Sequence, residues 1–172
     1  MKWKLVIFLV VICCCVSLAT AQSAQQSSDA KSVESSKDQD AKAYSGMYTF
    51  LREGEFVQIT VEDGGSVTGF ISRFGDGESD KGAFLDQFFK TGKLAGKTLT
   101  FRTDVVHGLS YDFKGEVDRG EGKSAGDDAY FVLKGALTEN VTDENKKVSS
   151  HSRDVVLKMF PQDATPGPPA RK

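Results

Sequence analysis

Cysteine is nearly missing from this sequence, and where it occurs it is confined to one run. All three cysteines are adjacent, at Cys13–Cys15, inside an apolar stretch from Leu5 to Val16. The rest of the chain can therefore build neither a disulfide framework nor a cysteine-based zinc site. A domain without disulfides must be held by its core and its hydrogen bonds. This is feasible at about 150 residues, a length that buries roughly two-thirds of the unfolded surface.

Histidine, tryptophan and basic runs are also scarce. The chain has two histidines, His107 and His151, and its single tryptophan is Trp3. The formal net charge is -2, and the lysines and arginines are scattered. Nucleic acids and anionic lipid surfaces select basic patches, so no nucleic-acid partner is predicted. Two distant histidines do not make a metal site, and neither a metal nor another cofactor is expected.

The apolar run near the start has the layout of a secretory signal peptide. Lys2 and Lys4 precede it, and Ala19-Thr20-Ala21 forms a small-residue cleavage site before Gln22. The run is too short to span a bilayer comfortably. Residues 1–21 are therefore predicted to be removed, leaving a secreted or periplasmic chain without a transmembrane span. The lack of disulfides favours a bacterial envelope or extracellular protein over a small secreted animal domain.

Two further segments contain too few large apolar residues to form a core. Residues 22–43 have Val33 as their only large, strongly apolar residue and predict a disordered tether, with a frayed helix over 29–42 as the alternative. Residues 163–172 hold three of the four prolines and predict a disordered tail. The folded domain is expected to cover residues 44–162.

Within that domain, apolar and polar residues alternate, which is the period of an antiparallel strand with one buried face. In the clearest case, Tyr111 and Phe113 point to one face, and Asp112 and Lys114 to the other. Glycine-containing turns separate such runs. The pattern predicts an all-β domain, an antiparallel meander curled into a small barrel or sandwich. Its seven expected strands cover residues 46–52, 54–62, 66–74, 97–106, 109–118, 129–139 and 149–160.

One segment departs from the alternation. Phe84, Leu85, Phe88 and Phe89 lie at i, i+1, i+4 and i+5, which is the spacing of an apolar stripe on a short helix over residues 83–90. So short a helix needs tertiary packing to exist, so it is predicted to plug the mouth of the curled sheet. The stripe is compatible with a plug that closes a ligand cavity and with one that only completes the core.

Few polar residues form a candidate site. Arg73 is in phase with the apolar face of its strand and is predicted to point inward, and Asp76 and Asp80 follow in an acidic loop. His107 lies in a turn near Asp104, where it could act as a general base. The acids could instead hold calcium, although their spacing is not that of an EF-hand loop, or shape the turn and cap the helix. No catalytic residue is assigned.

Ser45-Gly46-Met47-Tyr48 opens the first strand with a glycine-x-aromatic pattern. This pattern resembles the lipocalin, avidin and fatty-acid-binding (calycin) group. The resemblance implies an up-and-down barrel that binds a small apolar ligand, with Tyr48 packed at the closed end under a late-strand arginine, here Arg153. Tyrosine replaces the usual tryptophan, and the avidin-type tryptophan cage is absent. The ligand or plug candidates are Tyr48, Phe84, Phe88, Phe89 and Tyr111.

Three functions are compatible with these features. The first is an exported, non-catalytic barrel that binds a small apolar ligand or a partner protein. The second is a secreted enzyme that uses the His107/Asp104 turn and the acidic loop 76–80, and the third is a structural envelope protein with no ligand. Convergent polar groups in a cavity favour the first function. Convergence of His107 with Asp76, Asp80 or Arg119 favours the second, and a filled interior favours the third.

Export is expected to remove residues 1–21 because the cleavage site follows an apolar run of suitable length. Amino-terminal sequencing of the exported protein should therefore begin at Gln22. A start at Met1, or a lipid-modified cysteine within Cys13–Cys15, contradicts the signal-peptide interpretation.

Overall fold

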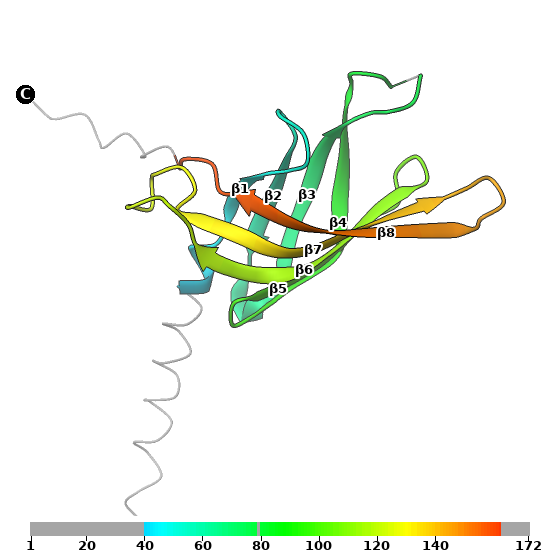
Figure 1. Ribbon diagram of the computed structural model, residues 1–172. Coiled ribbons are helices and arrows are strands. Elements are labelled where there is room, and N and C mark those ends of the chain that lie inside the picture. Colours follow the sequence, from blue (N-terminus) through cyan, green and yellow to red (C-terminus); the bar gives the residue numbers. More distant parts are fainter. Residues whose placement is uncertain (1–39, 79, 163–172) are drawn as a thin grey trace, which may run out of the picture. The chain divides into compact units, whose positions relative to one another are not determined.

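The computed structural model describes residues 40–78 and 80–162, which form one antiparallel sheet (Figure 1). Each strand pairs with the next along the chain, so the predicted all-β meander is confirmed. The predicted signal peptide and tail lie outside the described residues. The strands are β1 (Gly46–Thr49), β2 (Phe56–Val61), β3 (Val67–Phe74), β4 (Phe84–Ala95), β5 (Thr98–Thr103), β6 (Leu109–Arg119), β7 (Phe131–Thr142) and β8 (Val148–Lys158).

The sheet curls until its first and last strands meet (Figure 1). Tyr48 and Met159 form an antiparallel bridge between these edges. The N–H of Phe160 donates to the carbonyl of Met47 at 2.9 Å, and the N–H of Lys158 donates to Thr49 Oγ1 at 2.9 Å. Closure is therefore local to the end of the barrel that contains Tyr48, which we call the closed end.

The start of the domain packs against this end. Residues 40–42, the last part of the segment predicted as a tether, are helical, and Ala41 and Tyr44 pack against the core. Asp63–Gly65 forms a 3-10 turn between β2 and β3, and Lys42 reaches Asp63 across a 2.7 Å ion pair. No helix among the described residues is long and apolar enough to cross a membrane.

The helix and plug predicted over residues 83–90 are wrong. These residues belong to β4, which pairs with β3 through Phe70↔Phe88 and Phe74↔Phe84. The structure therefore has eight strands rather than seven. Phe84 and Phe88 face outward and are 53% and 59% exposed. The spacing of the apolar residues favoured a helix. In the folded chain this segment instead forms backbone hydrogen bonds with the edges of β3 and β5, because tertiary context overrides a weak local preference for helix.

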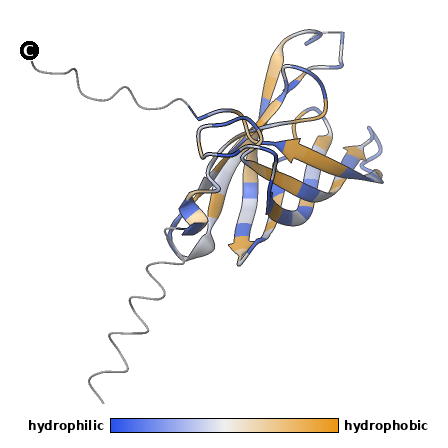
Figure 2. Ribbon diagram, turned by 60° about the vertical axis from the view of Figure 1, so that its left-hand side comes forward, coloured by the Kyte–Doolittle hydropathy of each residue, from blue (hydrophilic) through white to orange (hydrophobic). Residues whose placement is uncertain are grey.

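Apolar side chains pack the middle of the barrel. Phe89, Phe101 and Phe113 form a stack with ring centroids 4.3 Å and 5.2 Å apart. Hydrophobic and hydrophilic residues alternate along the strands (Figure 2). The buried residues of β5 and β6 fall at the positions predicted to face inward, which confirms the predicted phase. Gly115 and Gly135 lie opposite each other on β6 and β7, where a methyl group on either would collide with the facing backbone. These two glycines allow the close approach that a tightly coiled sheet requires.

Phe113→Ala should cost about 3–5 kcal/mol of unfolding free energy, because the ring is buried in the stack. Lys114→Ala, the neighbouring change on the exposed face, should cost less than about 0.5 kcal/mol. Urea unfolding of both variants checks the pair. Similar losses at the two positions would contradict the inward and outward assignment of β6.

Candidate ligand-binding site

The end of the barrel opposite the closed end, here called the polar end, carries inward-facing polar side chains from most strands. Each lies on a strand or, for Glu55, directly before one, in phase with that strand's apolar inward residues, so the interior changes from apolar to polar along the barrel. Glu55, Arg73, Gln87, Thr103 and Tyr111 are all at most 4% exposed. The group comprises Glu55, Arg73, Gln87, Thr103, Tyr111, Glu139 and Arg153.

Arg73, on β3, points inward as its phase predicts. Its Nε donates to Gln87 Oε1 at 2.7 Å, and its Nη1 donates to the carbonyl of Phe74 at 3.0 Å. Asp76 Oδ2 lies 3.4 Å from the same Nη1 and supplies the opposite charge. A buried guanidinium needs such compensation. Its remaining nitrogen, Nη2, has no hydrogen bond within the described part of the chain.

Glu55 is a buried carboxylate held by one arginine. Its Oε1 accepts from Arg52 Nε at 2.8 Å and from the N–H of Phe74 at 3.1 Å, and its Oε2 accepts from the N–H of Arg52 at 3.1 Å. The hydrogen bond to Glu55 holds the pKa of the Arg52 guanidinium above its usual value. Arg52 also donates to Asp76 Oδ1 at 3.1 Å. These contacts connect the β1–β2 turn to the end of β3. They also compensate the negative charge of the buried Glu55 carboxylate.

Gln87 and Thr103 form hydrogen bonds with backbone groups at the polar end. Gln87 Nε2 donates to the carbonyls of Leu109 and Asp104 at 2.8 Å and 3.3 Å. Thr103 Oγ1 accepts from the N–H of Tyr111 at 2.9 Å. Both side chains are thus used in holding β4, β5 and β6 together. The hydrogen bond to Thr103 fixes the backbone of Tyr111, and Gln87 links β4 to the β5–β6 turn and to the start of β6.

Unlike the side chains of Gln87 and Thr103, the hydroxyl of Tyr111 has no hydrogen-bond partner among residues 40–78 and 80–162. Its ring packs edge-on against Phe50, with centroids 5.3 Å apart. Burial, and secondarily the charge of Glu139, raises the pKa of Tyr111 to about 12. Tyr111 and Arg73 are only 3% and 4% exposed, and neither Tyr111 Oη nor Arg73 Nη2 is among the fully buried atoms that lack a partner. The polar end therefore offers two unused hydrogen-bond donors.

Two loops meet at the rim of the polar end. His107 Nδ1 lies 2.6 Å from Asp80 Oδ2, which links the β5–β6 turn to the acidic loop. The other oxygen, Asp80 Oδ1, is buried without a partner among the described atoms. Asp104, the acid nearest His107 in the sequence of this turn, takes part at this end through its backbone carbonyl, which accepts from Gln87 Nε2. Asp76 is held by Arg52 and Arg73.

The five predicted ligand candidates are dispersed over four places. Tyr48 is buried at the closed end, where its hydroxyl donates to the carbonyl of Tyr44 at 2.7 Å and burial raises its pKa. Phe84 and Phe88 lie on the outer face, and Phe89 lies in the core stack. Among these candidates, Tyr111 is the one found at the polar end.

The implied packing of Arg153 over Tyr48 is wrong. Arg153 forms a 3.5 Å ion pair with Glu139 and contributes to the electrostatic surroundings of Tyr111. A different arginine, Arg119, covers aromatic rings beyond the end of β6, with its guanidinium carbon 3.3 Å from the ring centroid of Tyr130. The glycine-x-aromatic pattern gave the correct strand but no information about which late-strand arginine lies near it.

Sequence reasoning missed Glu55, Gln87, Thr103 and Glu139 as members of the polar end. Three of them lay in predicted strands with an inward phase, so a search for polar residues on the apolar face could have found them. Gln87 could not be found in this way, because its inward position follows only when residues 84–95 form a strand.

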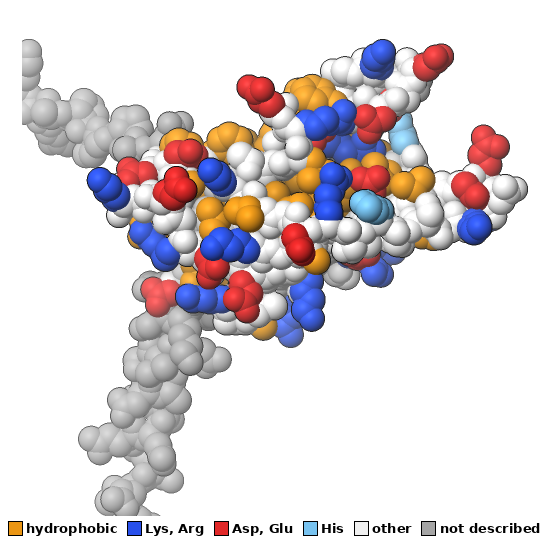
Figure 3. All heavy atoms as spheres, in the orientation of Figure 1, with side chains coloured by type: hydrophobic (Ala, Val, Ile, Leu, Met, Phe, Trp, Pro, Cys, Tyr) orange, Lys and Arg blue, Asp and Glu red, His pale blue; other side chains and the backbone are white. Residues whose placement is uncertain are grey.

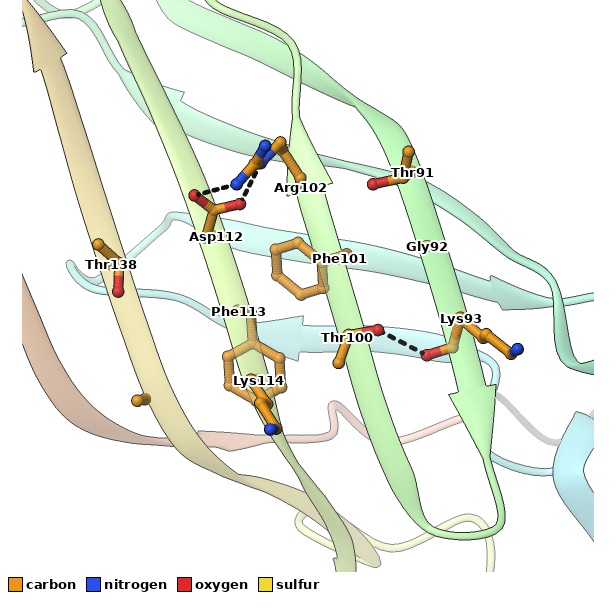
Figure 4. Close-up of a pocket in the computed structure, with 11 residues that line it drawn as sticks. Thr91, Gly92, Lys93, Thr100, Phe101, Arg102, Asp112, Phe113, Lys114 and Thr138 are labelled. Atoms are coloured by element: carbon orange, nitrogen blue, oxygen red, sulfur yellow. Dashed lines mark hydrogen bonds and ion pairs between the residues drawn. The ribbon is translucent and has the colours of Figure 1, made fainter. Parts of the chain in front are cut away.

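Two hollows lie away from the polar end. One, of about 530 Å³, is a groove on β4–β7, where the side chains of Arg102 and Asp112 pair (Figure 4). The other, of about 440 Å³, is lined by Tyr44, Tyr130 and Phe131. Positive and negative side chains are interspersed on the visible face (Figure 3). Within residues 40–78 and 80–162, no group of three acidic, histidine or cysteine side chains could hold a metal ion.

The fold defines an eight-stranded up-and-down barrel of the avidin-like type, so the calycin-like resemblance is confirmed for the fold. The crystal structure of rhizavidin matches with a TM-score of 0.55 and 13% identity, covering 76% of this chain and 93% of rhizavidin. Intact apo afifavidin matches with a TM-score of 0.51 and 12% identity, covering 78% of this chain and 97% of afifavidin. A rhizavidin–biotin complex gives a TM-score of 0.49 at 11% identity, covering 67% of this chain and 99% of that one.

No family model matches the sequence, and no curated protein matches it. The likeness to rhizavidin and afifavidin therefore concerns the arrangement of the strands. The residues of the polar end have to be interpreted from their own geometry.

Tyr111→Phe should make stability less sensitive to alkaline pH. Between about pH 10 and pH 12, an unfolded tyrosine ionises while folded Tyr111 stays neutral, so the wild type loses stability as the pH rises. From about pH 9 to pH 11.5, the variant should lose less stability than the wild type, by at most about 2 kcal/mol, because solvent screening reduces the effect of the shift. Urea unfolding at both pH values measures this difference. Equal losses would show that the Tyr111 hydroxyl is fully solvated.

Proposed function

We propose that this chain is an exported, non-catalytic binding protein that holds a small molecule at the polar end of its barrel. One observation carries the proposal: Tyr111 Oη and Arg73 Nη2 are donors with no hydrogen-bond partner among the described residues, at the polar end of a packed apolar interior. Convergent polar groups beside apolar walls are the usual composition of a ligand site. Export is supported by the sequence of residues 1–21.

The surroundings of the two donors indicate which ligands fit. Phe50 and Leu109 supply apolar contact beside Tyr111, while the phenylalanine stack fills the barrel below. A ligand would therefore bind at the mouth, presenting an oxygen or nitrogen acceptor to Tyr111 and Arg73. Biotin, which the rhizavidin complex contains, is a suitable first probe. The domain has no tryptophan, so Phe50 and Tyr111 would provide the aromatic contacts.

The proposal is tested by titrating the exported chain with biotin and with a panel of small carboxylates and amides, observed by NMR. A ligand should shift the Tyr111 ring and Arg73 side-chain signals. Tyr111→Phe should weaken binding about 5-fold, the effect of one hydrogen bond worth about 1 kcal/mol. Stability at neutral pH should stay unchanged, because the hydroxyl has no protein partner.

Tyr130→Phe, at the hollow beside Phe131, is the matched control and should leave binding unchanged. Compounds that shift only the Tyr44 and Tyr130 signals would place the site at that hollow instead. A panel that shifts neither group would favour a structural protein with no ligand and would overturn the proposal.

The enzyme alternative has one observation in its favour. A carboxylate on Nδ1, as Asp80 provides for His107, is the arrangement that orients a catalytic imidazole and leaves Nε2 available. However, no hydroxyl or thiol among the described residues forms a hydrogen bond with His107. The binding proposal expects His107→Ala and the wild type to hydrolyse p-nitrophenyl acetate at the same slow rate. A loss of about 10-fold or more in the variant would support the enzyme instead.

A further inference from the structure

The outer face of β2–β4 carries a cluster of outward-facing aromatic side chains that the proposed function does not use. We call this cluster the aromatic face. Its cross-strand pairs have ring centroids 5.5 Å apart for Phe70 and Phe88, and 4.5 Å apart for Phe74 and Phe84. Phe56 adds a third contact, 5.9 Å from Phe70. The five residues of the aromatic face are Phe56, Phe70, Phe74, Phe84 and Phe88.

Sheet stability does not explain this cluster fully. Cross-strand aromatic pairs stabilise a sheet by roughly 0.2–1 kcal/mol each, which accounts for the ring contacts. Yet Phe84 and Phe88 remain 53% and 59% exposed. Outward positions of an antiparallel sheet are normally polar, and a contiguous apolar patch on a soluble domain is typical of an interaction surface. Aromatic side chains are also the residue type enriched in the centres of such surfaces.

A single carboxylate lies within the aromatic face. The pair Ser72↔Asp86 is the row between Phe70↔Phe88 and Phe74↔Phe84. Rows on the same face are about 7 Å apart along a strand, so a phenylalanine pair flanks Asp86 on each side. Asp86 is exposed and has no ion pair within the described part of the chain. At the edge of the face, the guanidinium of Arg52 already lies 5.8 Å from the ring centroid of Phe74.

We propose that the aromatic face binds a segment of a partner protein that presents an arginine or lysine between apolar side chains. The cation would reach Asp86 and the negative faces of the neighbouring rings, as in a cation–π contact. The apolar flanks would cover Phe84 and Phe88. Charge complementarity favours this occupant over a second copy of the chain. Pairing two aromatic faces would bring two unpaired Asp86 carboxylates into one interface, and a buried, uncompensated charge is costly.

The test uses two peptides that differ in one residue: acetyl-Gly-Val-Val-Arg-Val-Val-Gly-amide and the same peptide with citrulline in place of arginine. NMR titration of the exported chain should show Phe84 and Phe88 ring shifts with the arginine peptide. The neutral peptide should bind at least about 5-fold more weakly. Asp86→Asn should weaken binding of the arginine peptide by a similar factor, and Phe88→Ser should abolish it.

Glu116→Gln is the matched control, because Glu116 is an exposed, outward-facing acid on β6, away from the aromatic face. It should leave peptide binding unchanged. Circular dichroism confirms that each variant is folded.

Three results would overturn the proposal. The first is equal affinity for the two peptides, or an Asp86→Asn variant that binds like the wild type. The second is a concentration-dependent dimer that Phe88→Ser converts to a monomer, which would identify a second copy as the occupant. The third is a shift of the Phe84 and Phe88 signals on removal of residues 163–172 without any peptide, which would identify the chain's own segment.

Discussion

Pairing of β4 with both of its neighbours is the constraint on which the rest of the barrel depends. The first part of β4 pairs with β3, and after an irregularity between Phe89 and Thr91 the second part pairs with β5. Without this strand, β1–β3 and β5–β8 would be joined only by the local contact of β1 with β8 at the closed end. The same strand supplies Gln87 to the polar end, Phe89 to the core stack and Phe88 to the aromatic face, because successive side chains of a strand point to opposite sides.

Along the barrel, the interior is apolar where polar groups would find no hydrogen-bond partners and polar where such partners are present. Aromatic and aliphatic side chains fill the middle, where a polar group would lack partners. At the polar end, Arg73 and Glu55 are buried but held by Gln87, Asp76 and Arg52, so their charges are compensated. Arg73 Nη2 and the Tyr111 hydroxyl are the donors at this end that remain without a partner among the described residues, and the proposed ligand would use them.

The two proposed surfaces are independent although β3 and β4 contribute to both. Arg73 and Gln87 face inward, whereas Phe74 and Phe88 face outward on the same two strands. A ligand at the polar end and a partner on the aromatic face could therefore bind together. The strands between them are joined by backbone hydrogen bonds, so binding on one side need not disturb the other.

The sequence by itself determined the antiparallel strands, the inward phase of Arg73, Tyr111 and Phe113, and the polar outer positions of β6, because alternation is a local property of each strand. Only the tertiary structure decided whether residues 84–95 form a helix or a strand. The spacing of Phe84, Phe88 and Phe89 fits one face of a helix, whereas in a strand it divides these rings between the two faces. Residues 84–95 form a strand because their backbone groups can hydrogen-bond to the edges of β3 and β5. Convergence at the polar end likewise depended on closure, since side chains from β2 to β8 meet only when the sheet curls until β1 and β8 meet.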